Sequence, residues 1–494
     1  MKYLLGFDIG SSSVKVALIE IANGKIAATA FSPADEMPIA APKTGFAEQD
    51  PDRWWQELQH ALQKVRQQVA FQGDEVAAIG ISYQMHGLVC VDKAGKPLRP
   101  SIIWCDGRAV AYGNKAFEAL GEDFSLSNFL NSPGNFTASK LKWVKENEPE
   151  LYKKIHKVML PGDYIALRLT GEATTTVSGL SEGILWNFKT RSVAKELLQY
   201  YGIDENLLSS MVPTFGEQGR LTAEAAGILH LKAGIPVSYR AGDQPNNAYS
   251  LNVLQPGEVA ATAGTSGVVY GVTDKVEYDP KSRVNTFVHV NHTDAQPRYG
   301  ILLCVNGTGI LNSWLRKNFF AAASYADMNA LAAAVSPGAD GLQFFPFGNG
   351  AERVLENKDM GAMLRGLQFN RHDRGHVARA AQEGIVFSLQ YGMEVMQQMG
   401  MQLKTIRAGH ANMFLSEVFG KVFANTTGCT VELYNTDGAA GAARAAGVGA
   451  GIYPDFVSCF TGMNVIKKLE PEKGLQEQYR NIYGAWKHML QSNL

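Results

Sequence analysis

The sequence predicts an α/β protein built from two similar domains, and three observations support this fold class. The chain has 494 residues, which exceeds the roughly 250 to 300 at which a single hydrophobic core stops growing. Strand-like and helix-like segments alternate along it. A hairpin pattern with a small, polar tip occurs at residues 3–16 and again, about half a chain later, at residues 258–272. We therefore expect two related domains, residues 1–245 and 246–494, that face one ligand across a cleft.

Composition excludes several classes of protein. The chain carries 46 basic and 47 acidic side chains, so it has no electrostatic footprint for nucleic acid or for an anionic membrane. Its five cysteines are odd in number and form no C-x-x-C pair, which argues against a disulfide framework and a structural zinc site. No run of 18 apolar residues and no leader pattern occur. We expect a cytoplasmic protein with no nucleic-acid partner and no membrane partner.

The first hairpin has a composition that suits phosphate binding. An apolar run, residues 3–7, ends at Asp8, and a second alternating run begins at Val14. Small residues at the tip let backbone N–H groups converge on an anion, and a carboxylate at a strand end can hold Mg²⁺ through water. An ordinary turn rich in glycine and serine has the same composition, so both interpretations stay open. The tip and the start of the second strand contain Gly10, Ser11, Ser12, Ser13 and Lys15.

Two polar clusters follow in the first half of the chain. A helix is expected to start at Pro51, and the strand after it, residues 76–82, ends at Gln84, Met85 and His86. Strand ends of α/β proteins face ligand crevices, although a lone histidine is more often a structural residue. The second cluster, residues 104–108, begins at Trp104; its Asp/Arg pair fits a ligand rim or a braced loop. Residues 186–201 are expected to contain an amphipathic helix.

A third cluster lies at a strand-to-helix junction. A short apolar strand ends at Gly242 and Asp243, and Gln244 follows in what we expect to be a helix. Aspartate is a favoured helix N-cap residue. The same position also suits a general base at the edge of a cleft.

The second hairpin and the segments after it repeat the small-residue pattern. Gly309 precedes another helix, and the strand at residues 405–408 leads into Gly409 and Asn412. A helix rich in glycine and alanine follows at residues 438–451. Small residues at such places allow an adenine ring, or a closely packed helix, to approach the backbone. The tip of the second hairpin consists of Gly264, Thr265 and Ser266.

Motifs of other nucleotide-dependent and metal-dependent enzymes are absent from the sequence. It contains no G-x-x-x-x-G-K-[ST] loop, no G-x-G-x-x-G fingerprint after a strand and no H-E-x-x-H. P-loop kinases, nicotinamide dehydrogenases and zincins are therefore disfavoured.

Taken together and in order, these segments resemble the FGGY family of carbohydrate kinases over nearly the whole chain. Its D-x-G-[TS]-S-x-x-K opening is similar to residues 8–15, and its S-E-Q-D-P-x-x-W-W segment to residues 47–55. The Q-M-H-G segment of the members that phosphorylate D-xylulose resembles residues 84–87, and their W-N-D-G-R segment resembles residues 104–108. Residues 160–164, 167–172 and 264–267 also match.

The resemblance implies two RNase H-like (actin-like) domains with ATP and sugar in the cleft between them. It also implies transfer of the γ-phosphoryl group of ATP to the terminal hydroxyl of a ketopentose, most readily D-xylulose. The resemblance implies that Asp243 is the catalytic base. It also implies that Asp8 and Asp243 both lie near Mg²⁺. The sugar contacts implied are Gln84, Met85, His86, Trp104, Asp243 and Gln244. The ATP contacts implied are Gly10, Ser11, Ser12, Ser13, Lys15, Gly264, Thr265, Ser266, Gly309, Gly409 and Asn412.

The sequence departs from the family pattern at several of these places. Gln244 replaces an asparagine, Cys105 replaces another, and Asn135 is additional. Residues 408–413 replace the G-G-G-A-R-S adenine segment, and residues 350–355 replace G-E-R-T-P. A kinase for another sugar or polyol, such as ribulose, fuculose or glycerol, is the first alternative. An ATP-binding sensor or assembly protein without catalysis is the second, and a homodimer is the expected assembly on symmetry grounds.

Overall fold

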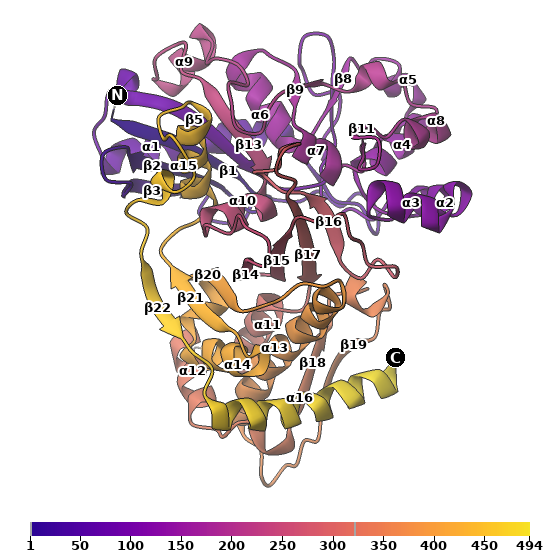
Figure 1. Cartoon of the computed structure of the whole chain (residues 1–494), viewed down its shortest axis with the longest axis vertical. Helices are drawn as coiled ribbons and strands as arrows, with labels where there is room; N and C mark the ends of the chain where they lie inside the picture. The colour runs from indigo at the N-terminus through magenta and orange to yellow at the C-terminus, as the bar shows by residue number, and fades with distance from the viewer. Residues whose placement is uncertain (1, 321–322) are drawn as a thin grey trace. The chain divides into compact units, whose positions relative to one another are not determined.

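The computed structural model describes residues 2–320 and 323–494, which form two compact units (Figure 1). Unit 1 comprises Met1–Asn252, Phe287–Tyr299 and Thr436–Met463. Unit 2 comprises Val253–Thr286, Gly300–Asn435 and Asn464–Leu494. The boundary between residues 245 and 246 stays a prediction.

Unit 1 is organised around a five-stranded sheet with the order β13-β5-β1-β2-β3. Strand β1 is antiparallel to β2 and parallel to β5, and β5 is in turn parallel to β13. Every residue of β5 is buried, as expected for a central strand covered on both faces. The strands are β1 (Tyr3–Ile9), β2 (Val14–Glu20), β3 (Ile26–Ser32), β5 (Val76–Tyr83) and β13 (Val237–Gly242).

Two helices cover opposite faces of this sheet. Successive residues of β1 point to opposite sides, so alternate residues of the strand contact different helices. Leu5 and Phe7 belong to the apolar core that contains Trp54 of α1 (Pro51–Gln68), a helix whose N-cap is Asp50. Gly6 faces the other helix, α15 (Gly438–Gly449). The predicted first hairpin and the predicted helix after Pro51 are both confirmed.

Helix α15 lies unusually close to the sheet. A Cβ on Gly6 would be 1.9 Å from the carbonyl oxygen of Ala439, and a Cβ on Gly80 of β5 would be 2.0 Å from that of Ala442. Such distances leave room only for glycine on the strands. The small residues of α15 therefore serve helix-to-sheet packing, one of the two interpretations that the sequence left open.

Smaller elements complete unit 1. The helix expected within residues 186–201 is present as α8 (Lys195–Tyr201); before it, Asn187 Oδ1 accepts the N–H groups of Lys189 and Thr190 and forms a turn. The helices are α2 (Val110–Leu120), α3 (Glu122–Phe129), α4 (Thr137–Asn147), α5 (Pro149–Tyr152), α6 (Pro161–Thr170), α7 (Val177–Glu182), α8 (Lys195–Tyr201), α9 (Ala223–Leu229) and α10 (Asp243–Ser250). The short strands are β4 (Glu48–Gln49), β6 (Val89–Val91), β7 (Ser101–Ile102), β8 (Lys157–Met159), β9 (Thr174–Thr175), β10 (Trp186–Asn187), β11 (Ser192–Val193) and β12 (Ser210–Met211).

Unit 2 contains a second, seven-stranded sheet with the order β16-β17-β15-β14-β20-β21-β22. The predicted second hairpin is confirmed: β14 and β15 are antiparallel, and β14 is parallel to β20. The strands are β14 (Val259–Ala263), β15 (Gly267–Thr273), β16 (Asn285–Val288), β17 (Tyr299–Val305), β20 (Thr405–Gly409), β21 (Thr430–Tyr434) and β22 (Val465–Leu469). A separate hairpin consists of β18 (Gln343–Phe347) and β19 (Gly361–Arg365).

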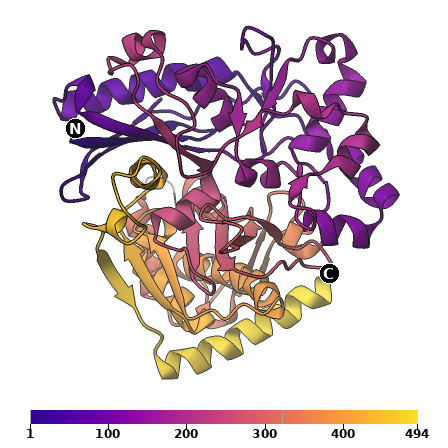
Figure 2. The same ribbon diagram turned by 45° about the horizontal axis from the view of Figure 1, so that its top comes forward.

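The helices of unit 2 pack around one apolar core. The C-terminal helix α16 is drawn in yellow (Figure 2). It buries Trp486, whose indole N–H donates to the Phe344 carbonyl at 2.9 Å. The helices are α11 (Gly309–Phe319), α12 (Tyr325–Ala333), α13 (Arg374–Gln398), α14 (Glu417–Thr427) and α16 (Lys473–Asn493). Within the described residues no helix is both long and apolar enough to cross a membrane.

Candidate active site

Asp8 lies near the end of β1, on the face that α15 covers. A Cβ on Gly438, the first residue of α15, would be 2.6 Å from Asp8 Oδ2. Burial raises the pKa of the Asp8 carboxyl; Lys15, its partner across the hairpin, lowers it, and Asp437 raises it again. The carboxyl thus lies in a poorly hydrated site that contains other acids.

Asp243 lies at the first position of α10, directly after β13. The N-cap of this helix is Gly242, and no side chain caps it, so the N-cap interpretation of Asp243 does not hold. Burial and then the charge of Asp8 raise the pKa of Asp243 to about 7, while hydrogen bonds with Gln244 lower it. A carboxyl whose pKa is near neutrality is matched to general-base catalysis.

The parallel pairing of β1, β5 and β13 explains why these two acids meet. The carboxyl ends of parallel strands lie at one edge of a sheet, and β5 pairs with β1 on one side and with β13 on the other. Asp8 and Asp243 are 235 positions apart in the sequence but lie at this same edge. The sequence identified both residues, and the sheet brings them together.

The residues after β5 lie at this edge as well. The Gln84 backbone N–H donates to the Ile9 carbonyl at 2.8 Å, which aligns the end of β5 with the end of β1. Met85 is buried, and a Cβ on Gly242 would be 2.6 Å from its Cγ. Met85, one of the predicted sugar contacts, therefore borders the residue that precedes Asp243.

His86 has a left-handed backbone conformation with φ 61°. Its Nδ1 donates to the Glu182 carbonyl at 2.8 Å, because a carbonyl can only accept. The ring also contacts Phe136 and Phe287, with centroids 4.8 and 5.4 Å away. These contacts orient the imidazole.

The hairpin tip contacts the segment at residue 104. The indole N–H of Trp104 donates to Ser11 Oγ at 3.2 Å, and the Ser12 carbonyl accepts the Met37 N–H at 2.8 Å. Gly10 closes the tip by donating to the Ser13 carbonyl at 3.1 Å. The tip residues and Lys15 remain half-exposed or exposed.

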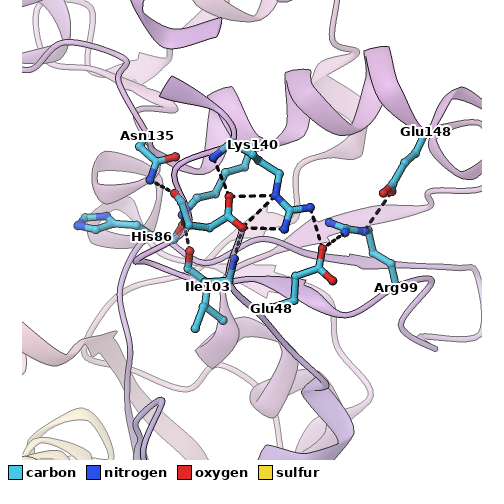
Figure 3. A network of polar contacts seen from close by, with 10 residues as sticks. Glu48, His86, Arg99, Ile103, Asn135, Lys140 and Glu148 are labelled. Carbon is cyan, nitrogen blue, oxygen red and sulfur yellow. Dashed lines mark hydrogen bonds and ion pairs between the residues drawn. The ribbon is translucent and has the colours of Figure 1, made fainter. Parts of the chain in front are cut away.

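Asp106 and Arg108, by contrast, brace a loop. Asp106 is fully buried; its Oδ2 lies 2.6 Å from Arg108 Nη2 and accepts the Ala47 N–H at 2.5 Å. Arg108 also forms an ion pair with Glu48, with 2.7 Å between Nη1 and Oε1. Glu48 pairs in turn with Arg99, and Arg99 pairs with Glu148 (Figure 3). The structural interpretation of the Asp/Arg pair therefore holds, and Trp104 projects from a braced loop.

Sequence reasoning missed two acids at this edge. Glu182 ends α7; its side chain is 1% exposed, and a Cβ on Gly242 would be 2.3 Å from its Oε2. Burial, then Asp243 and Asp163, raise the pKa of Glu182 well above its ordinary value. Asp437 caps α15 by accepting the Ala440 N–H at 2.8 Å. Its position before a small-residue helix was a detectable N-cap pattern, whereas nothing in the sequence marked Glu182.

Unit 2 brings its own predicted residues together. Gly309 N–H donates to the Gly264 carbonyl at 2.9 Å, and Ile310 N–H donates to the Thr265 carbonyl at 3.0 Å. Asn412 has φ 53°, and its Nδ2 is 3.6 Å from where a Gly264 Cβ would be. The hairpin tip, the start of α11 and the segment after Gly409 therefore form one cluster, and Ser266 belongs to the same tip.

The residues present fit a magnesium ion whose ligands are mainly water and phosphate oxygens, with one or two protein carboxylates. The described residues contain no group of three or more His, Cys, Asp or Glu side chains arranged for a metal. Asp8 and Asp243 are close enough to raise the pKa of Asp243. Mg²⁺ prefers carboxylate oxygens and is commonly bound by one or two of them together with water and phosphate oxygens. This donor set therefore suits a Mg²⁺ ion that enters with a nucleotide.

Comparison with known families identifies the family of this chain. The model of the FGGY family of carbohydrate kinases, N-terminal domain, matches residues 3–249, and that of the C-terminal domain matches residues 259–450. The chain belongs to the FGGY family of carbohydrate kinases. It is thus a carbohydrate kinase, and the sugar kinases of this family use ATP. The resemblance seen in the sequence is confirmed.

Individual relatives of this FGGY kinase cover nearly its whole length. It is 29% identical to the xylulose kinase of Bacillus subtilis over 98% of this chain and 97% of that one, and 28% identical to that of Lactococcus lactis over 100% and 97%. The structure of xylulose kinase from Rhodospirillum rubrum superposes with a TM-score of 0.87 at 25% identity, covering 99% and 98% of the two chains.

Two solved structures share the fold at lower identity. One is a gluconate kinase from Lactobacillus acidophilus, with a TM-score of 0.89 at 22% identity over 99% of this chain and 98% of that one. The other is a glycerol kinase from Plasmodium falciparum, with a TM-score of 0.86 at 20% identity over 100% of this chain and 98% of that one. The predicted fold class, an α/β chain with two RNase H-like (actin-like ATPase) domains, is confirmed.

Proposed function

We propose that this FGGY kinase transfers the γ-phosphoryl group of ATP to the terminal (5-) hydroxyl of a ketopentose, converting D-xylulose to D-xylulose 5-phosphate. The observation that carries the proposal is Asp243, a carboxyl at the start of α10 whose pKa is raised by burial and by the charge of Asp8. The residue before it, Gly242, lies against Met85. The names of the xylulose kinases in two bacteria support the choice of sugar.

Asp243 acts as the general base in the proposed reaction. Its carboxylate takes the proton of the sugar hydroxyl while that oxygen forms a bond to the γ-phosphorus. The bond from the γ-phosphorus to the β,γ-bridging oxygen breaks, and ADP leaves with that electron pair. A positioned base of this kind typically contributes about 10² to 10⁴-fold to the rate.

Other residues bind and orient the two substrates. The side chains of Gln84, His86 and Trp104 hydrogen-bond sugar hydroxyls, while Met85 packs against the carbon chain and Gln244 lies beside the base. Mg²⁺ near Asp8 and Asp243 offsets phosphate charge when it is bound. The proposed nucleotide contacts are Gly10, Ser11, Ser12, Ser13 and Lys15 in unit 1 and Gly264, Thr265, Ser266, Gly309, Gly409 and Asn412 in unit 2.

The decisive experiment measures ADP release by the purified protein with Mg-ATP and a panel of acceptors. The panel contains D-xylulose, L-xylulose, D-ribulose, L-ribulose, L-fuculose, glycerol and gluconate. We expect strong stimulation by D-xylulose alone. Silence across the panel with nucleotide still bound would refute the proposal and favour an ATP-binding sensor or assembly protein.

A kinase for another sugar or polyol is the second candidate. Gln244, directly beside the proposed base, has a longer side chain than the asparagine of the family pattern and changes the space available to the acceptor. Stimulation by a different member of the panel would support this candidate. A Gln244→Asn variant should then shift the preference toward D-xylulose.

A homodimer is the assembly we propose, because isologous dimers are the commonest closed oligomers. Light scattering on the eluting protein, at concentrations around those of the kinetic assay, tests this. A mass of one chain, 53.7 kDa, would refute it.

A further inference from the structure

Lys140 is a buried cation that the proposed mechanism does not use. It lies in α4, and its side chain is fully buried. Its Nζ donates one hydrogen bond to the carbonyl of His86 at 2.8 Å and another to the carbonyl of Ile103 at 3.0 Å (Figure 3). An ammonium group is costly to bury unless nearby groups require it. Its position therefore calls for a specific role.

The two carbonyls belong to the two segments that carry the proposed sugar contacts. His86 is itself one contact, and Ile103 directly precedes Trp104. The left-handed backbone of His86 is unfavourable for a residue other than glycine and persists only where its surroundings hold it in place. A single side chain thus joins the end of the β5 segment to the loop after β7.

The nearby acid Asp106 is already neutralised by Arg108, so Lys140 is not needed as its ion-pair partner. The hydrogen bonds to the two carbonyls are then the distinctive contribution of Lys140. Burial lowers the pKa of Lys140 to about 7; Asp106, Cys105 and Glu182 raise it, and Arg108 lowers it. Asp106 already forms a close ion pair with Arg108 at 2.6 Å and accepts the N–H groups of Ala47 and Arg108. The ammonium group donates its hydrogen bonds to the carbonyls of His86 and Ile103, and within the described residues it forms no ion pair with Asp106.

We propose that Lys140 is a positioning residue for the sugar acceptor, holding the His86 and Trp104 segments in register through the carbonyls of His86 and Ile103. The inference rests on the proposed kinase function and adds a determinant of acceptor affinity. Lys140 does not touch the acceptor; it acts through the backbone that carries the contacts. Its loss should weaken sugar binding selectively.

The first test replaces the ammonium by an apolar group of similar length. Lys140→Met should raise the KM for the preferred acceptor by about tenfold or more, with the KM for ATP within about twofold of the parent. The matched control is Lys142→Met on the same helix, because Lys142 forms a partly exposed i,i+4 pair with Glu146. The control should change neither KM. An unchanged acceptor KM in a folded Lys140→Met variant would overturn the proposal, and so would parallel rises in both KM values.

A second variant separates hydrogen bonding from charge and guards against loss of folding. Lys140→Gln is neutral but retains two N–H donors, so we expect it to recover most of the acceptor affinity. A Lys140→Gln protein as defective as Lys140→Met toward the acceptor would overturn bridging through the carbonyls.

Hydrogen exchange supplies a readout that does not depend on catalysis. In Lys140→Met, amide exchange should accelerate in peptides that cover residues 84–87 and 103–107 and stay unchanged in unit 2, whereas Lys140→Gln, which keeps two donors, should exchange at rates close to those of the parent. Acceleration throughout unit 1 would mean a general structural role and would overturn the proposal. If the parent phosphorylates no acceptor, the proposed function fails, while the exchange experiment still decides whether Lys140 holds these two segments.

Discussion

Replacing Asp243 by asparagine should abolish most activity while making the free protein more stable. The Asp243→Asn side chain has nearly the same shape but cannot take a proton. We expect turnover to fall by a factor on the order of 10² or more, because the loss of a positioned base costs about 10² to 10⁴-fold. The reaction would retain only the contribution of substrate alignment.

The stability effect follows from the raised proton affinity of Asp243. The pKa rises from 3.8 to about 7 through burial and then the charge of Asp8. That difference corresponds to about 4 kcal/mol of preference for the protonated form. Because the residue keeps some exposure, solvent screening reduces this value, and we expect about 2 to 4 kcal/mol.

The sign of the pH dependence is set by which state binds the proton more tightly. Between pH 3.8 and about 7 the native state holds more protons at Asp243 than the unfolded state, so its contribution to stability falls as pH rises. Above about pH 7 the full cost of ionisation is present. Asp243→Asn removes that cost, so its advantage over the parent should be small near pH 4 and largest near pH 8.

The assay combines calorimetry with kinetics. Melting is measured in EDTA without nucleotide at several pH values, where a gain on the order of 5 °C is expected near pH 8. Exposed Asp35 of the same unit supplies the control, and Asp35→Asn should change neither melting nor turnover. Turnover of Asp243→Asn within tenfold of the parent would refute the base assignment. A variant that melts no higher than the parent at pH 8 would refute the electrostatic argument.

Three further predictions use other parts of the structure. His86→Ala should raise the KM for the acceptor with ATP binding retained, measured by steady-state kinetics; equal loss of both would make His86 structural. Gly6→Ala should destabilise unit 1 by several kcal/mol or prevent folding, because its Cβ would be 1.9 Å from the Ala439 carbonyl oxygen; Gly227→Ala, with open space around it, is the control, and chemical denaturation compares the two. Removal of divalent cations with EDTA should abolish ADP release, and added Mg²⁺ should restore it; full activity in EDTA would exclude the proposed metal.

Local patterns in the sequence were sufficient to predict the two hairpins. The apolar run that ends at Asp8 and the run that begins at Val14 are strands with the expected turn between them. Residues 258–272 form the second hairpin as predicted. Such patterns are readable because strand periodicity and turn composition depend on neighbouring residues alone. The helix expected within residues 186–201 is α8, and the turn formed by Asn187 precedes it.

Where a residue had two interpretations, the three-dimensional structure decided between them. Asp243 was a possible N-cap until the structure assigned that position to Gly242. The small residues of α15 were equally suited to a ligand or to a sheet until Gly6 and Gly80 were seen against its backbone. Asp106 proved to be a buried partner of Arg108. The packing of α15 depends on strands far away in the chain, and the other two decisions depend on backbone and side-chain geometry that residue types alone do not specify.

The sequence by itself determined the fold class, through its length and its alternating pattern, and the family, through short motifs; the same motifs predict Asp8, Asp243 and the segment at Gln84 as site residues. Only the tertiary structure placed Asp8 and Asp243 at one edge of the sheet, through the parallel pairing of β1, β5 and β13. It also revealed Glu182 and Lys140, which no motif marks. Their proton affinities follow from burial and from neighbouring charges, and both exist only after distant segments have packed together.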